Sequence, residues 1–253
     1  MSVKPLVAGN WKMNPEAGNF IELASEISDE ISKIEGVTKV LCPPAVALRE
    51  VANALEGSDV LVGAQDGHPE ASGAFTGEVA MPMLSSICSY VIVGHSERRA
   101  LFGETDQYVA RKAVAAIASG LSPILCIGES LDIRDAGDAL SYVHDQLVAS
   151  LDGVNDPTSL VIGYEPIWAI GTGVSARPDI VGEMGESIRN TLTGLYGGEA
   201  ALNVPILYGG SVSPVNIGPY IDRPHINGAL VGGASLTPSD FGRIVSLVAS
   251  IRG

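Results

Sequence analysis

The stretch Leu160-Val161-Ile162-Gly163-Tyr164-Glu165-Pro166-Ile167-Trp168-Ala169-Ile170-Gly171-Thr172-Gly173 joins an apolar run to a carboxylate and then to a segment rich in turn-forming residues. The apolar run predicts a buried strand. Pro166 fixes one edge of the following segment, and Gly171 and Gly173 permit backbone geometries closed to other residues. An ionisable group beside such a hinged cover indicates a base that works away from water. A surface loop with a solvated Glu165 fits these residues equally well.

Short apolar runs like this one recur along the whole chain, separated by segments with apolar residues three or four positions apart. The runs predict strands, and the intervening segments predict helices. Thr105 and Pro238 stand where two of these helices are expected to start. The predicted strands cover residues 6–9, 38–42, 60–64, 90–93, 123–127, 160–163, 205–208 and 229–231.

Eight strands alternating with helices predict an α/β fold in which the strands are parallel and joined by right-handed crossovers. A closed (β/α)8 barrel and an open doubly wound sheet both satisfy that order. The strand count, the length of 253 residues and the lack of a linker favour the barrel. We expect one barrel domain over residues 1–253.

The bulk composition narrows the possible partners and location. A formal net charge of −14 argues against binding to nucleic acid or to an anionic membrane. The apolar runs are too short for a membrane span, and the first residues do not resemble a signal peptide, so we expect a cytoplasmic location. Cys42, Cys88 and Cys126 lack metal-ligand or disulfide spacing, so we expect inert buried thiols and no metal.

In a barrel of this kind, the residues that follow the strands meet at one end and form the active site. These positions carry two amides, a lysine, a thiol, an imidazole, two carboxylates and two diglycine turns. They are Asn10, Lys12, Cys42, Gln65, His95, Glu129, Glu165, Gly209, Gly210, Ser211, Gly232 and Gly233.

Glu165 and His95 together supply the minimum for enolisation, because one can take a carbon-bound proton while the other polarises a carbonyl. His95 directly precedes an expected helix start, and we expect the helix to lower its pKa and keep the imidazole neutral. Lys12 adds the positive charge that an enediolate and a phosphate both require in a chain this acidic. The diglycine turns after strands seven and eight are typical of a phosphate site.

Seven motifs then occur in order at compatible spacing, and on them the sequence resembles the triosephosphate isomerase family. In that family a glutamate is the established base, and a neutral histidine polarises the carbonyl. The motifs are GNWKMN at 9–14, GAFTGE at 73–78, VGHSERR at 93–99, CIGE at 126–129, YEPIWAIGTG at 164–173, YGGSV at 208–212 and LVGGASL at 230–236.

The resemblance implies interconversion of dihydroxyacetone phosphate and D-glyceraldehyde 3-phosphate, a step of glycolysis and gluconeogenesis, with no metal or organic cofactor. Glu165 would move the proton, His95 would donate to the oxyanion, Lys12 and Asn10 would stabilise it, and Glu97 would hold Lys12 or relay charge beside it. The substrate and its phosphate would contact Asn10, Lys12, Gly171, Ser211, Leu230, Gly232 and Gly233. The lid would comprise Pro166, Ile167, Trp168, Ala169, Ile170, Gly171, Thr172 and Gly173, with Ile170 and Leu230 pressing on Glu165.

The resemblance also implies a homodimer in which the loop from Gln65 to Glu78, with Phe75 and Thr76, inserts into the partner. Two departures from the family stand out. Val174 replaces a basic residue at the end of the lid, and Asn227 replaces an aspartate that would pair with Arg189. An Asn can still accept a hydrogen bond there. A barrel for another phosphorylated sugar and a barrel without catalysis are the rival interpretations, and the complete set of motifs argues against both.

Overall fold

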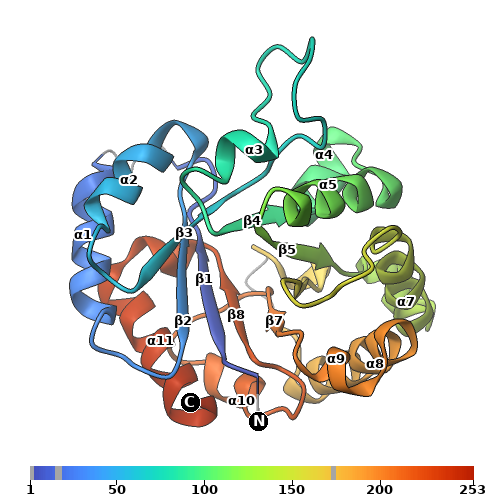
Figure 1. Cartoon of the computed structure of the whole chain (residues 1–253). Coiled ribbons are helices and arrows are strands. Elements are labelled where there is room, and N and C mark those ends of the chain that lie inside the picture. Colours follow the sequence, from blue (N-terminus) through green and yellow to red (C-terminus); the bar gives the residue numbers. More distant parts are fainter. Residues whose placement is uncertain (1–2, 15–18, 172–174) are drawn as a thin grey trace.

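The computed structural model describes residues 3–14, 19–171 and 175–253. Eight parallel strands form a closed barrel in chain order, because β1 pairs with β8 as well as with β2 (Figure 1). Closure excludes the open doubly wound sheet and confirms the predicted (β/α)8 fold. The strands are β1 Leu6–Asn10, β2 Thr38–Cys42, β3 Val60–Ala64, β4 Tyr90–Val93, β5 Ser122–Ile127, β6 Val161–Tyr164, β7 Ile206–Tyr208 and β8 Gly228–Val231.

Each strand begins and ends within one residue of its predicted limits. Parallel strands of a barrel are covered on both faces, so they occur in the sequence as continuous apolar runs with clear ends. Alternate residues, such as Leu6 and Val40, belong to a cluster formed by strand residues that fills the barrel interior. The residues between them, such as Val7 and Leu41, belong to the larger core between the strands and the helices.

Helices surround the barrel (Figure 1). The Thr105 side chain accepts a hydrogen bond from the Tyr108 N–H at the start of α5, and Pro238 occupies the first turn of α11, so both predicted starts are confirmed. The α-helices are α1 Phe20–Ile31, α2 Leu48–Ala54, α3 Met81–Leu84, α4 Ser96–Phe102, α5 Asp106–Ala118, α6 Leu131–Asp135, α7 Ala139–Ser150, α8 Pro178–Tyr196, α9 Gly198–Leu202, α10 Ile217–Ile221 and α11 Pro238–Arg252. Three 3-10 helices are η1 Ala45–Ala47, η2 Ile167–Ala169 and η3 Gly233–Leu236.

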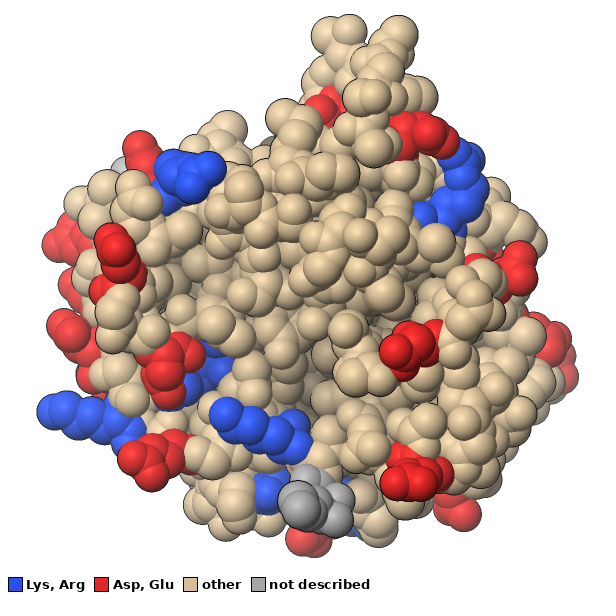
Figure 2. Space-filling view, viewed as in Figure 1, with Lys and Arg blue, Asp and Glu red and all other residues tan. Residues whose placement is uncertain are grey.

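The molecular surface bears on possible partners. On the face shown in Figure 2, Asp and Glu side chains lie mainly toward the edges. The loop of residues 65–78, between β3 and α3, stands out from the body of the barrel at the top of Figure 1. Among the residues described, no helix combines the length and the apolar composition that crossing a membrane requires.

Candidate active site

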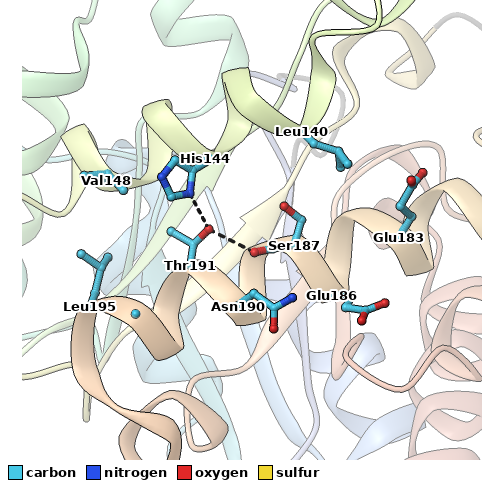
Figure 3. A pocket seen from close by; sticks show the side chains of 10 residues that line it. Leu140, His144, Val148, Glu183, Glu186, Ser187, Asn190, Thr191 and Leu195 are labelled. Carbon is cyan, nitrogen blue, oxygen red and sulfur yellow. Dashed lines mark hydrogen bonds between the residues drawn. The ribbon is translucent and has the colours of Figure 1, made fainter.

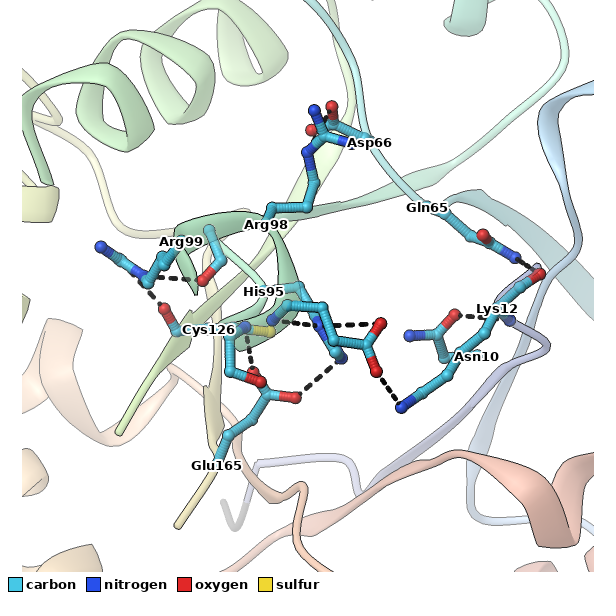
Figure 4. A network of polar contacts seen from close by, with 12 residues as sticks. Asn10, Lys12, Gln65, Asp66, His95, Arg98, Arg99, Cys126 and Glu165 are labelled. Carbon is cyan, nitrogen blue, oxygen red and sulfur yellow. Dashed lines mark hydrogen bonds and ion pairs between the residues drawn. The ribbon is translucent and has the colours of Figure 1, made fainter. Parts of the chain in front are cut away.

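Glu165 follows β6 directly and is almost completely buried, with 2% of its surface exposed. Its Oε1 lies 2.9 Å from His95 Nε2, and its Oε2 accepts a 2.9 Å hydrogen bond from the Ser96 N–H (Figure 4). The solvated-loop interpretation of Glu165 is therefore excluded. Burial acts to raise the pKa of Glu165, but the imidazole, the Ser96 N–H and the Lys12 ammonium lower it, and the net direction is downward.

His95 caps the N-terminus of α4, and its Nδ1 accepts a hydrogen bond of 3.2 Å from the Glu97 N–H. Because Nδ1 is an acceptor in this arrangement, the ring proton is assigned to Nε2, which faces Glu165. Burial acts to lower the pKa of His95, but the Glu165 carboxylate raises it by more, so the pKa lies above its ordinary value. The expected lowering of this pKa is therefore wrong for this arrangement, because the Glu165 carboxylate in contact, together with Glu97, outweighs the lowering by burial and by Lys12.

Lys12 has a backbone φ of 52°, and no other non-glycine residue in the described part of the chain has a positive φ. Its N–H donates to Asn10 Oδ1 at 3.0 Å, and its carbonyl accepts from Gln65 Nε2 at 2.9 Å. The ammonium forms an ion pair with Glu97, which is the contact that the resemblance implies. Side chains on both sides of its peptide thus hold Lys12 in an uncommon backbone conformation.

One pocket of about 260 Å³ brings most of the expected site residues together. The turns after β7 and β8 form one wall of this pocket. A Cβ at Gly209 would lie 3.0 Å from Glu165 Cγ, so a side chain there would press on the carboxylate. The Ser211 N–H, expected to face a phosphate, instead donates to the Ala169 carbonyl at 3.0 Å. The described pocket lining comprises Asn10, Lys12, His95, Glu165, Ile170, Gly171, Gly209, Gly210, Ser211, Val212, Leu230, Gly232, Gly233 and Ala234.

The expected lid is described from Pro166 to Gly171, and Thr172, Gly173 and Val174 lie outside the described residues. Trp168 Nε1 donates to Glu129 Oε1 at 2.9 Å, so the first half of the segment is tied to a residue two positions beyond β5.

Glu129 is completely buried and also contacts Tyr164 and Arg134. Sequence reasoning placed Glu129 at the correct end of the barrel but did not assign it this anchoring contact. The signal in the sequence that could have indicated this contact is the position of the Glu129 carboxylate, two residues beyond a predicted strand.

The 65–78 loop carries the residues expected at a subunit interface. The Phe75 ring packs on the His68 ring with centroids 4.2 Å apart, and 43% of Phe75 remains exposed. Thr76 is exposed. Large apolar side chains elsewhere on the surface are also exposed, among them Val46 and Leu101. The loop therefore folds partly on itself and leaves apolar surface uncovered.

Cysteines and histidines could form two kinds of site in the described part of the chain, a metal site or a reactive thiol. No group of three or more His, Cys, Asp or Glu side chains there could hold a metal ion. Cys42, Cys88 and Cys126 are free and buried, as expected. Burial raises the pKa of all three thiols, that of Cys88 to about 11, so they remain protonated near neutral pH.

A larger cavity lies elsewhere, as a groove of about 640 Å³ between α7 and α8 (Figure 3). His144 Nδ1 lies 2.9 Å from Thr191 Oγ1, which donates to the Ser187 carbonyl. These polar groups bond to one another within the helix pair. Cavity size therefore does not identify the site, whereas the charges and N–H groups around the smaller pocket do.

Comparisons with known proteins agree with this geometry. The family model described as triosephosphate isomerase matches residues 5–248. Proteins named triosephosphate isomerase from Lactobacillus delbrueckii subsp. lactis and Chloroflexus aurantiacus are 47% and 50% identical over 249 and 244 residues. The first alignment covers 97% of this chain and 99% of the relative, and the second covers 95% and 98%. One from Carboxydothermus hydrogenoformans is 49% identical over 248 residues, covering 96% of this chain and 98% of the relative.

Proposed function

Because the chain belongs to the triosephosphate isomerase family, we propose that it interconverts dihydroxyacetone phosphate and D-glyceraldehyde 3-phosphate through an enediolate. The observation that carries this proposal is the buried Glu165 beside the His95 Nε2, in one pocket with Lys12 and the two glycine turns. The reaction is a step of glycolysis and gluconeogenesis and takes place in the cytoplasm. The proposed chemistry is a proton transfer, for which these side chains suffice without a metal or organic cofactor.

Glu165 is the base in the proposed reaction. Its carboxylate takes a proton from C1 of dihydroxyacetone phosphate, the C–H electron pair forms the C1–C2 double bond, and the C2 oxygen becomes the oxyanion. The carboxylic acid then returns the proton to C2, and the C1 oxygen becomes the aldehyde after its own proton has moved to the C2 oxygen. The same group thus acts as base and then acid, and no external oxidant or reductant is needed.

His95 and Lys12 stabilise the charge that develops on the substrate oxygens. The oxygen of a substrate seated between His95 and Glu165 would accept the hydrogen bond from the His95 Nε2–H. The substrate would thereby separate the imidazole from the carboxylate. That separation removes the contact that raises the pKa of His95, while the Glu97 N–H on Nδ1 continues to favour the neutral ring. Lys12, held by Glu97 and Asn10, then supplies the positive charge.

The phosphate occupies the wall of the pocket formed by the glycine turns. Gly232 and Gly233, at the start of η3, line that wall together with Gly171, and their backbone N–H groups are the proposed donors to the phosphate. The Ser211 N–H joins them only if it leaves the Ala169 carbonyl, so phosphate binding is coupled to a movement of the Pro166–Gly171 segment relative to β7. Such a movement would also press Ile170 and Leu230 on Glu165 and raise its basicity by desolvation.

The active protein is further proposed to be a homodimer. The exposed Phe75 and Thr76 stand on the protruding loop, and a pocket of about 270 Å³ lined by Gln65, Asp66 and Arg98 is available to receive the partner's loop. Light scattering on a Thr76→Arg variant tests this: we expect a dimer for the parent chain and a monomer for the variant. A monomeric parent chain at micromolar concentration would contradict it.

The function is tested by steady-state turnover of glyceraldehyde 3-phosphate, coupled to reduction of the ketone product. Parent chain and Glu165→Gln are measured side by side. We expect rapid turnover that falls about 10³–10⁴-fold in the variant, because the base is removed while the shape of the pocket is kept. Equal and negligible rates for both proteins would show that the fold serves another purpose.

A further inference from the structure

Arg99 lies in α4, four residues after His95, and its side chain is 13% exposed. Its Nε donates to the Gly94 carbonyl at 2.7 Å, and its Nη2 donates to the Cys126 carbonyl at 3.2 Å (Figure 4). The same guanidinium pairs with Asp106 at 2.5 Å and donates to Ser150 Oγ at 3.1 Å. One side chain thus joins the ends of β4 and β5 to the start of α5 and the end of α7.

The Gly94 carbonyl belongs to the peptide directly before His95. Gly94 has a φ of 67°, a left-handed conformation in which a Cβ would lie 2.7 Å from Val109 and 3.0 Å from the Arg99 guanidinium. The chain turns here from β4 into α4, and the next two residues supply two contacts to the Glu165 carboxylate, the His95 imidazole and the Ser96 N–H. A shift of the Gly94 peptide would therefore move both partners of the proposed base together.

The charge of Arg99 is balanced by Asp106, and the charged groups that shift the pKa of Glu165 are His95 and Lys12. Its effect on the site is consequently one of position. An arginine suits this place because its planar fork presents N–H groups in several fixed directions, whereas a lysine has a single ammonium on a flexible stem.

We propose that Arg99 is a positioning residue that fixes the Gly94–His95 peptide, and with it the distance of His95 and Ser96 from the base. This inference rests on the proposed isomerase function. A displacement of about 1 Å at a reacting group costs about 10²-fold in rate, so loss of the guanidinium should lower kcat strongly. KM should change little, because the glycine turns that hold the phosphate do not contact Arg99.

The test compares kcat, KM and melting temperature for the parent chain, Arg99→Met and Arg99→Lys. Arg99→Met should lose about 10²-fold in kcat with KM within about threefold, and Arg99→Lys should recover part of that loss. Arg189→Met is the matched control. Arg189 is also a buried arginine that donates to a carbonyl, that of Ala201, but its partner Asn227 lies before β8, at the opposite end of the barrel. Arg189→Met should lose stability and keep kcat.

Three outcomes overturn the proposal: Arg99→Met retains kcat within about twofold, it loses kcat no more than Arg189→Met, or its KM rises as much as its kcat falls. If Arg99→Met does not fold, the kcat of Asp106→Ala tests the proposal instead. This substitution removes the ion pair that holds one side of the Arg99 guanidinium. A roughly tenfold loss of kcat at constant KM supports the proposal, and a kcat equal to that of the parent overturns it. Turnover by the parent chain that is lost in Glu165→Gln tests the isomerase function separately, so a failure of the positioning role is distinguished from a failure of the isomerase function.

Discussion

Two groups of charged side chains meet at α4, and each contains a buried carboxylate. In the site network, defined as Lys12, His95, Glu97 and Glu165, the carboxylate of Glu165 contacts an imidazole and a backbone N–H. In the ion network, defined as Asp66, Arg98, Glu104 and Lys112, Glu104 Oε1 contacts Lys112 at 2.6 Å and Arg98 at 2.5 Å. The two carboxylates are similarly buried but have partners of different kinds.

This difference separates a carboxylate that can change its protonation from one that cannot. Two permanent cations hold Glu104 ionised, and the four charges of the ion network balance. Among the described residues no Lys or Arg side chain forms an ion pair with Glu165, and the Lys12 ammonium pairs with Glu97. Its main partner can itself gain or lose a proton near neutral pH. Burial alone therefore does not identify a base, and the chemistry of the contacts does.

Breaking the ion network should have the largest effect, and that effect should be on stability. Lys112→Met leaves the carboxylates of Asp66 and Glu104 without their most buried cation and should cost about 3–5 kcal/mol of unfolding free energy. Thermal unfolding measures the loss, and kcat per folded molecule should stay within about twofold. Arg111→Met on the same helix is the control. Its ion pair with Glu70 is half-exposed, and its loss should cost less than about 1 kcal/mol. A catalytic defect in folded Lys112→Met would erase the distinction between the networks.

Breaking the site network should affect rate and spare stability. Lys12→Met should lower kcat/KM by about 10²–10³-fold, because the enediolate and the phosphate lose their nearest cation. The Lys12–Glu97 pair is partly exposed, so the melting temperature should hardly change. Lys33→Met removes the same charge from an exposed position on the surface and should leave both quantities unaltered. The assignment fails if the two variants have equal activity.

Lowering the pH should reduce the difference in folding stability between Glu104→Gln and the parent chain. Burial acts to raise the pKa of Glu104, but Lys112 and Arg98 lower it more, so the folded pKa lies below the ordinary value. Its stabilising effect is therefore present above the unfolded pKa and is lost as pH falls through the folded pKa.

Melting temperatures of the two proteins between about pH 7 and pH 3 test this sign. The variant should be about 2 kcal/mol less stable near neutral pH and should approach the parent as pH falls below about 4. Glu165, whose pKa is lowered too, is present in both proteins and cancels in the difference. Asp66 has a raised pKa, so its contribution to stability changes with pH in the direction opposite to that of Glu104. The narrowing of the stability difference at low pH is therefore due to Glu104. A constant difference across this range would contradict the assignment.

The comparison also explains what could be predicted from sequence. The strands and the positions of Lys12, His95 and Glu165 at their ends follow from local apolar runs and from the geometry of parallel barrels. The hydrogen bond from the Ser96 N–H to Glu165 spans 69 residues, and the bond from Trp168 to Glu129 spans 39. Contacts of this kind exist only once the barrel has closed. The prediction for the pKa of His95 was wrong for that reason, since its direction depends on a carboxylate brought in by β6.

A third buried charge, Arg189, gives the smallest predicted effect. It is 5% exposed and donates to the Asn227 Oδ1 at 3.2 Å, which confirms that Asn227 accepts a hydrogen bond there. Its only partners among the residues described are neutral oxygens, and burial lowers its pKa to about 10. Burial thus disfavours the charged form of Arg189, because no carboxylate among the described residues pairs with it.

Asn227→Asp supplies that carboxylate and should stabilise the fold by about 1 kcal/mol, because hydrogen bonds to charged groups are stronger than neutral ones. Thermal unfolding should show a rise of about 2–4 °C, with kcat unchanged because Asn227 precedes β8, at the end of the barrel away from Glu165. The gain should vanish in Arg189→Met/Asn227→Asp, where the new carboxylate has no cation. The introduced carboxylate can still accept the Ile206 N–H that Asn227 now accepts at 3.0 Å. A lower melting temperature for Asn227→Asp alone would mean that desolvation of the new charge outweighs the pair.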